Sequence, residues 1–250
     1  MRAWIAGLSC AAAIAVSALT LTAPLALAAA DTIDEARVEA IIERLLTEKP
    51  ELVIDAIRAY QAREEAAKAD EQRKQVLAQK DSILGNPNDP FIGNPDAKYT
   101  VVEFFDYRCG FCKRSLQTVL DLVERNKDVR VVFKEFPILG EESVLAARVS
   151  LALQKVAPQN YGKFHETVMR HRGTLSEEAL LAIATKVGAN ATAVQNAMKD
   201  PSIQETIRNN YRLAEALNIR GTPAFIIGDA VIPGAVDLAT LERLIADLRS

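Results

Sequence analysis

The stretch VVEFFDYRCGFCKR, residues 101–114, places two cysteines three positions apart, after an apolar strand-like run and at the start of a helical pattern. Cysteines at positions i and i+3 of a helix lie on one face, close enough to bond to each other. In the first turn, the thiol of Cys109 would meet unpaired backbone N–H groups and the positive end of the helix dipole, which both favour the thiolate. Basic side chains add positive charge nearby: Arg108, Lys113 and Arg114. We therefore expect Cys109 to be a nucleophile and Cys112 to be a more buried resolving thiol.

The first 30 residues carry the pattern of a secretory signal peptide. Arg2 is their only charged residue, and an apolar run rich in alanine and leucine ends in small residues that offer cleavage after Ala28 or after Ala30. The run is also long enough to span a bilayer, so an uncleaved anchor is the alternative. We favour cleavage, because the small residues come just before the charged Asp31. This pattern predicts an exported protein of the periplasm.

Cleavage would remove Cys10 and leave Cys109 and Cys112 as the cysteines of the mature chain. Two cysteines so close together cannot connect distant parts of a fold, so redox chemistry is favoured over a structural role. A zinc site would need four ligands, and the chain offers no second cysteine pair and two histidines, which we interpret as surface residues. We expect no metal and no cofactor, because the Cys109–Cys112 disulfide itself carries the electrons. The near balance of 30 basic and 33 acidic residues argues against nucleic acid as a partner.

The remaining chain divides into a helical segment, residues 31–84, and an α/β domain, residues 85–250. The sequence GNPNDPFIGNP, residues 85–95, marks the boundary between them through its prolines, glycines and asparagines. Within the domain, hydrophobic periodicity predicts strands and helices in an α/β order, with a helical insertion at about 140–218. The predicted strands are 99–105, 129–136, 223–228 and 231–232, and the flanking helices are 109–126 and 237–248.

Apolar stripes mark the helical segment before the domain. Helical spacing relates Ile41, Ile42, Leu45 and Leu46, and a second stripe follows the break at Lys49-Pro50. Residues 61–75 are highly charged, with alanines as their apolar residues, so they suit a solvated spacer helix. Because two short stripes need a partner surface, we expect a homo-oligomer that forms through residues 31–80.

Glu103 lies six residues before Cys109, inside the apolar run. On a buried strand its pKa would be raised, and it could pass protons to or from the resolving thiol. Alternatively it faces an edge and pairs with a lysine such as Lys134. The alternation of the strand leaves both interpretations open.

The sequence Gly221-Thr222-Pro223 precedes a predicted strand. A proline there can simply mark the strand boundary. After a glycine–threonine pair, and with the cysteine pair upstream, a cis-proline is the sharper hypothesis, because it would leave the backbone of Thr222 free to pair with an extended client chain. We expect Thr222 and Pro223, with Gly110 and Phe111 between the cysteines, to contact the client.

In this order and spacing, VVEFFDYRCGFCKR, EFPILG and RGTPAF resemble the DsbA-like thioredoxin superfamily over roughly residues 85–250. The resemblance implies a thioredoxin-like α/β fold with an inserted helical subdomain, in which Cys109 attacks and Cys112 resolves. It also implies that Glu103 is a buried acid and that Thr222-Pro223 is a cis-proline loop. The helices before the domain resemble those of ScsC and Com1-type members, some of which oligomerise through that region.

One difference from the family concerns the residues between the cysteines. Strongly oxidising DsbA members carry Pro-His there, whereas this chain has Gly-Phe, which is closer to the disulfide isomerase DsbC. The threonine before the proline is closer to DsbC and DsbG. We therefore expect an isomerase or reductase that acts on envelope proteins with cysteines and is reset by a membrane redox partner. The alternatives are a DsbA-type oxidase and, outside the enzymes, an envelope holdase or assembly scaffold.

Overall fold

The computed structural model describes residues 34–250. The predicted signal peptide, residues 1–30, lies outside the described residues, and so does Cys10. The chain forms two compact units, an N-terminal unit up to Arg58 and a C-terminal unit from Ala59 to Ser250. Within 34–250, no helix combines the length and the apolar character that are needed to cross a membrane.

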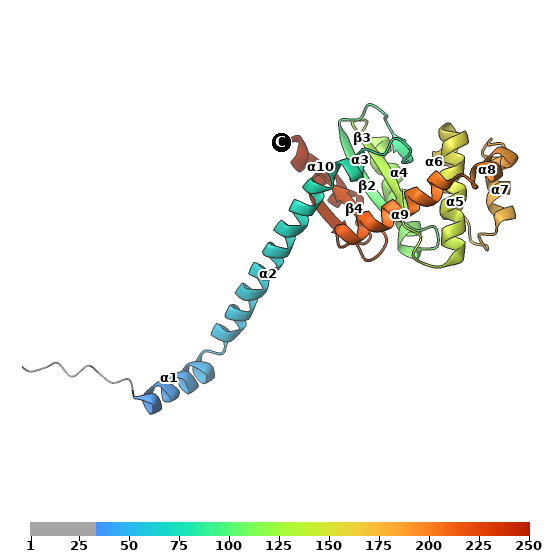
Figure 1. Cartoon of the computed structure of the whole chain (residues 1–250). Coiled ribbons are helices and arrows are strands. Elements are labelled where there is room, and N and C mark those ends of the chain that lie inside the picture. Colours follow the sequence, from blue (N-terminus) through green and yellow to red (C-terminus); the bar gives the residue numbers. More distant parts are fainter. Residues whose placement is uncertain (1–33) are drawn as a thin grey trace, which may run out of the picture. The chain divides into compact units, whose positions relative to one another are not determined.

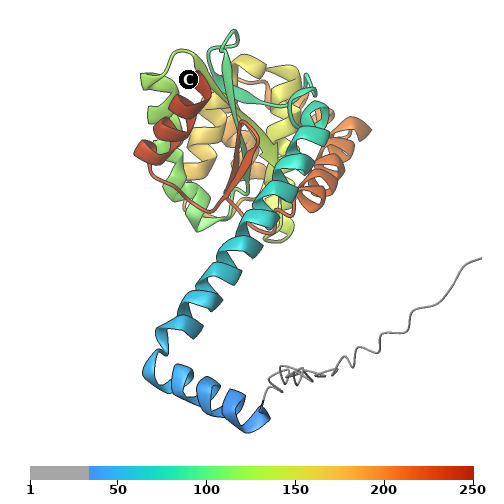
Figure 2. The same ribbon diagram turned by 90° about the vertical axis from the view of Figure 1, so that its left-hand side faces the viewer.

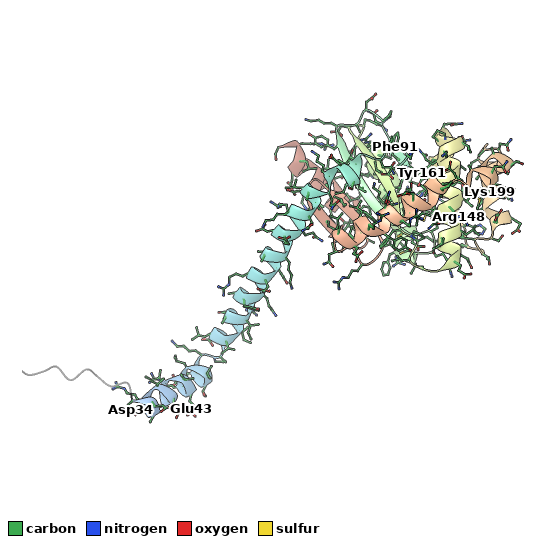
Figure 3. All side chains as sticks on the ribbon, viewed as in Figure 1. Asp34, Glu43, Phe91, Arg148, Tyr161 and Lys199 are labelled. Atoms are coloured by element: carbon green, nitrogen blue, oxygen red, sulfur yellow. The ribbon has the colours of Figure 1, made fainter. Side chains whose placement is uncertain are left out.

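The N-terminal unit consists of α1 (Glu35–Glu48) and the first turns of α2 (Glu51–Ala78). Asp34, labelled in Figure 3, caps α1 by accepting a hydrogen bond of 3.3 Å from the backbone N–H of Ala36. The helices break at Lys49-Pro50, as predicted. The large apolar side chains of this unit are all exposed, and we call them the N-terminal apolar face: Val38, Ile41, Ile42, Leu45, Leu46, Leu52, Val53, Ile54 and Ile57.

The C-terminal unit is built on a sheet with the strand order β1-β3-β2-β4-β5. Strands β2 and β3 are parallel, and the other neighbouring pairs are antiparallel. The strands are β1 (Phe91–Gly93), β2 (Tyr99–Phe105), β3 (Val129–Glu135), β4 (Ala224–Ile227) and β5 (Ala230–Pro233). The central strands β2 and β3 are largely buried because helices cover both faces of the sheet.

Two helical layers enclose this sheet (Figures 1 and 2). On one face lie α4 (Gly110–Arg125) and α10 (Leu238–Arg249), with α6 (Tyr161–Arg170) packed against α4. On the other face lie α9 (Pro201–Ala216), α3 (Lys80–Leu84) and the end of α2. Since side chains alternate along a strand, Val101, Glu103 and Phe105 face the α4 layer, while Val102 and Phe104 face the α9 layer.

The helical insertion begins after β3 and ends with α9, which agrees with the predicted range of about 140–218. It contains α5 (Glu141–Val156), a 3₁₀ turn (Pro158–Asn160), α6, α7 (Glu177–Lys186), α8 (Ala191–Ala197) and α9. Figure 1 shows α5, α7 and α8 at the end of the unit away from α10. Arg148 links α5 to the end of α8 by donating a hydrogen bond of 3.3 Å to the carbonyl of Met198. The α/β architecture is confirmed, and its predicted strands and helices match closely.

Residues 85–95 were predicted to separate two domains, but they lie within the C-terminal unit. Phe91–Gly93 forms the edge strand β1 against β3, and Asp89 forms a buried ion pair with Lys134. Before it, Val76 and Ile83 are buried at 3% exposure in the α9 layer. The compact C-terminal unit therefore extends further toward the N-terminus than residue 85, because apolar side chains at the end of α2 and in α3 complete its core.

Candidate functional site

The two cysteines lie where α4 begins. Cys109 is the N-cap residue of α4. It therefore lies just before the first helical turn, in which it was predicted. The N–H of Cys112 donates a hydrogen bond of 3.4 Å to the Sγ of Cys109. Both thiols are free, and Cys112 is more buried than Cys109, with exposures of 1% and 6%. The predicted order of burial is confirmed, and the geometry gives Cys109 the more accessible sulfur.

The other residues predicted to contact a client gather around Cys109. The Thr222–Pro223 bond is cis, as predicted, and the Cys109 thiol lies 3.1 Å from the carbonyl oxygen of Thr222. Phe111, between the cysteines, is 58% exposed, and Gly110 is exposed beside it. A backbone carbonyl thus lies beside the nucleophile, and an exposed aromatic ring follows it two residues along the chain.

Hydrogen bonds at Cys109 and burial of Cys112 shift the pKa values of the two thiols in opposite directions. The Cys112 thiol lowers the pKa of Cys109 to about 5, helped by the Thr222 side chain and by the N–H groups of Cys112 and Phe111, against the raising effect of burial. The pKa of Cys112 is raised far above its ordinary value, by burial first, then by its bond to Cys109 and by the charge of Glu103. Near neutral pH, Cys109 is therefore a thiolate and Cys112 a thiol.

The neighbouring cations, which their positions in the sequence suggested as a further cause, each contact another group. The Arg108 Nε lies 3.7 Å from a carboxylate oxygen of Glu142, and Lys113 donates a hydrogen bond of 2.9 Å to the carbonyl of His171. The guanidinium of Arg114 lies 4.2 Å from the centroid of the Phe111 ring.

Glu103 is buried in the middle of β2, on the face that carries the cysteines. Its strand neighbours are Phe133 on β3 and Phe225 on β4. Lys134 points to the opposite face and pairs with Asp89, so the alternative pairing of Glu103 with Lys134 is wrong. Burial, and next the charge of Cys109, raise the pKa of Glu103 to about 8. A carboxyl that holds its proton up to this pH can exchange it with the adjacent thiol pair.

Asp106 is a part of the site that the sequence reasoning missed. Its carboxylate is 1% exposed and accepts three hydrogen bonds, from the N–H of Arg108, the N–H of Leu139 and the hydroxyl of Ser143. Its own carbonyl accepts the N–H of Cys109. Asp106 therefore fixes the turn before the nucleophile against the start of α5. An aspartate directly after an apolar strand was the available signal.

A second polar cluster lies buried behind this turn and corrects the interpretation of His165 as a surface residue. His165 is 2% exposed, and its Nδ1 lies 3.3 Å from the hydroxyl of Tyr107. Burial lowers the pKa of His165 to about 3, so the ring is neutral. Within residues 34–250, no group of three or more His, Cys, Asp or Glu side chains is arranged to hold a metal ion.

Replacing Glu103 with glutamine is expected to stabilise the reduced protein at neutral pH. The folded state retains a proton on Glu103 up to about pH 8, whereas the unfolded state releases it near 4.5, so this residue costs stability as the pH rises between these values. The gain for Glu103→Gln is on the order of 3 kcal/mol at pH 7 and vanishes near pH 4.5. Urea unfolding of both reduced proteins at pH 4.5, 7 and 9 measures it. A gain that stays constant with pH would contradict the buried-acid assignment.

Comparisons with known proteins agree with this geometry. The model of the DsbA-like thioredoxin domain matches residues 100–246. Disulfide bond formation protein D of Bacillus subtilis is 27% identical over 66% of this chain and 80% of its own length. A periplasmic thioredoxin-like protein from Salmonella enterica serovar Typhimurium is 37% identical, covering 68% of this chain and 96% of its own, with a TM-score of 0.63.

A further solved structure extends the likeness to the N-terminal helices. ScsC from Proteus mirabilis, in a compact conformation, is 32% identical, covers 86% of this chain and 98% of its own, and has a TM-score of 0.63. The family model covers more than half of the chain, and it matches where the structure places the cysteine pair and the cis-proline loop. The chain therefore belongs to the DsbA-like thioredoxin domain family and is a thiol–disulfide oxidoreductase of the DsbA and ScsC type.

Proposed function

We propose that this protein is a periplasmic disulfide isomerase and reductase that acts on other proteins through Cys109 and Cys112. The observation that carries the proposal is the pair of unequal thiols, of which the more accessible one has a pKa of about 5. Reference values are about 3.5 for the strong oxidant DsbA and about 7 for the reductant thioredoxin. An intermediate value supports a protein that can both attack a client disulfide and release the client again.

In the proposed reaction, the Cys109 thiolate attacks one sulfur of a client disulfide. A mixed disulfide forms, and the second client sulfur leaves as a thiolate. In isomerisation, that client thiolate or another one attacks a client sulfur and returns Cys109 unchanged. In reduction, Cys112 loses a proton, attacks the Sγ of Cys109 and releases the client thiol, so that two electrons pass to the client.

Glu103 is proposed as the acceptor of the proton that Cys112 must lose in the mixed disulfide, where Cys109 carries no charge and so no longer raises the pKa of Glu103. The charge of Glu103 raises the pKa of Cys112, and the pKa of Glu103 itself, about 8, lies close to neutral pH. Reduction leaves a Cys109–Cys112 disulfide, so a dithiol partner at the membrane must return two electrons before the next turnover. No cofactor takes part in this scheme, because both sulfurs belong to the chain.

Location and assembly complete the proposal. Export through residues 1–30 would bring the chain to the compartment of the periplasmic relative from Salmonella. The N-terminal apolar face is expected to bind the same face of other copies, since its nine side chains are 37–52% exposed within the described chain. The likeness to ScsC from Proteus mirabilis includes this region.

A DsbA-type oxidase is the second candidate, because a pKa well below neutrality also stabilises the reduced form and so favours oxidation of a client. Two measurements separate the candidates: the redox state of Cys109 and Cys112 in cells after acid quenching and thiol labelling, and the reactivation of scrambled ribonuclease. We expect reduced cysteines and reactivation. Oxidised cysteines without reactivation would establish an oxidase. A variant with both cysteines replaced by serine that keeps its cellular function would establish a holdase or scaffold.

A further inference from the structure

Four cations surround the exposed turn that carries Cys109, and we call them the cationic rim: Arg108, Lys113, Arg114 and Arg172. Arg114 covers the turn itself, with its guanidinium over the Phe111 ring and one nitrogen 3.8 Å from the position of a Cβ on Gly110. Lys113 reaches the loop after α6 through the carbonyl of His171, next to Arg172. Burial first, and then the charges of Arg108 and Arg172, lower the pKa of Lys113, which agrees with the proximity of the two arginines.

Few negative charges balance this rim. Glu142 lies 3.7 Å from Arg108, and both side chains are partly exposed. The carboxylate of Asp106 is buried and already accepts three hydrogen bonds. Among the described residues, no ion pair within 4.0 Å includes Lys113, Arg114 or Arg172. The rim thus keeps an excess of positive charge beside the nucleophile.

This excess is not needed to activate the nucleophile. The pKa of Cys109 is lowered by hydrogen bonds from Cys112, Thr222 and Phe111. Clustered like charges repel one another, so the rim costs energy in the free protein. An approaching chain that carries negative charge reduces this repulsion. A client must approach at this place, because Cys109 and the carbonyl of Thr222 lie side by side.

We infer that the cationic rim selects client disulfides whose cysteines are flanked by acidic residues. Complementary charges raise the rate of encounter and favour the correct partner, more strongly at low salt. The inference rests on the proposed action on proteins and adds the chemical class of the preferred client segment. Arg114 is the main positioning cation, since it lies over the turn between the cysteines.

The test compares three peptide disulfides that differ only in the residues flanking the cysteine, which are Asp, Asn or Lys. For the mature full-length protein we expect kcat/KM to be about tenfold higher for the acidic than for the basic peptide at low ionic strength, and the ratio to fall as salt is added. A combined Arg114→Gln and Arg172→Gln variant should lower the ratio at least about threefold, while Arg114→Lys should retain most of it.

A matched control is Lys199→Gln, which removes one charge from the exposed loop after α8, labelled in Figure 3, and should leave the ratio as it is. Titration of thiolate absorbance should give the same Cys109 pKa in all variants. Equal rates for the three peptides, or a pKa that rises in Arg114→Gln, would overturn the inference. Turnover of the neutral disulfide of 2-mercaptoethanol without turnover of any peptide would instead refute the proposed action on proteins.

Discussion

Cys112→Ser is expected to accumulate in covalent complexes with client proteins. Cys109 keeps its position beside Thr222 and can still attack, but no sulfur at position 112 remains to release the mixed disulfide. Cys109→Ser should form few such complexes, because the remaining thiol is 1% exposed and its pKa is raised by burial. We expect at least about a tenfold difference between the two variants in trapped client.

The measurement is a non-reducing gel of acid-quenched cell extracts, followed by mass spectrometry of the bands that disappear on reduction. The control is the double serine variant, which sets the background of non-covalent association. Equal trapping by the two single variants would contradict the division of roles, and trapping by Cys109→Ser alone would reverse it.

Deletion of residues 31–58 is expected to give a folded monomer that reduces disulfides but has lost most of its isomerase activity. The deletion removes the N-terminal apolar face and leaves the cysteines, Glu103 and the cis-proline loop intact. An isomerase must hold a misfolded client through repeated attacks, and several sites in one assembly raise their effective concentration. We expect reactivation of scrambled ribonuclease to fall about tenfold or more.

The position of this deletion follows from the packing of α2. Gln72 donates a hydrogen bond of 3.1 Å to the carbonyl of Leu217, and Val76 is buried against the α9 layer. A deletion as far as residue 80, the end of the association segment predicted from the sequence, would therefore damage the C-terminal unit. The end of α2 belongs to the core of the oxidoreductase domain.

A point substitution tests assembly in the full-length chain. Leu45→Glu places a charge in the N-terminal apolar face, and Ala40→Glu places the same charge on the opposite side of α1 by helical spacing. Light scattering should find a monomer for Leu45→Glu and the assembled state for Ala40→Glu. A wild-type monomer would refute the assembly proposal, and an unchanged isomerase rate after deletion would refute its link to activity.

The sequence predicted the fold well because strong local signals agree with the tertiary structure. The apolar runs of β2 and β3 and the helical insertion predicted from hydrophobic periodicity coincide with the observed elements. Glu103 was correctly placed on a buried strand, but its face could be decided only from the register against Phe133 and Phe225. Periodicity alone leaves that choice open, because both faces of the strand are apolar.

Features that depend on distant partners could not be predicted. β1 is three residues long, and its pairing with β3 is visible only in the assembled sheet. His165 has charged neighbours along the chain, yet it lies among Phe105, Phe133 and Tyr161 in three dimensions. The sequence correctly predicted that backbone N–H groups lower the pKa of Cys109, but it could not show the larger effect of the Cys112 thiol or the contribution of the distant Thr222 side chain.

The three hydrogen bonds of the Asp106 carboxylate define the smallest part of this protein that could be transplanted. A graft of the CGFC turn alone onto another scaffold would omit the anchor that orients it. The portable unit includes Glu103 to Cys112 together with the segment from Leu139 to Ser143, which supplies two of the three donors. An engineer who recombines domains of this family would therefore place crossover points outside these two segments and exchange them as a pair.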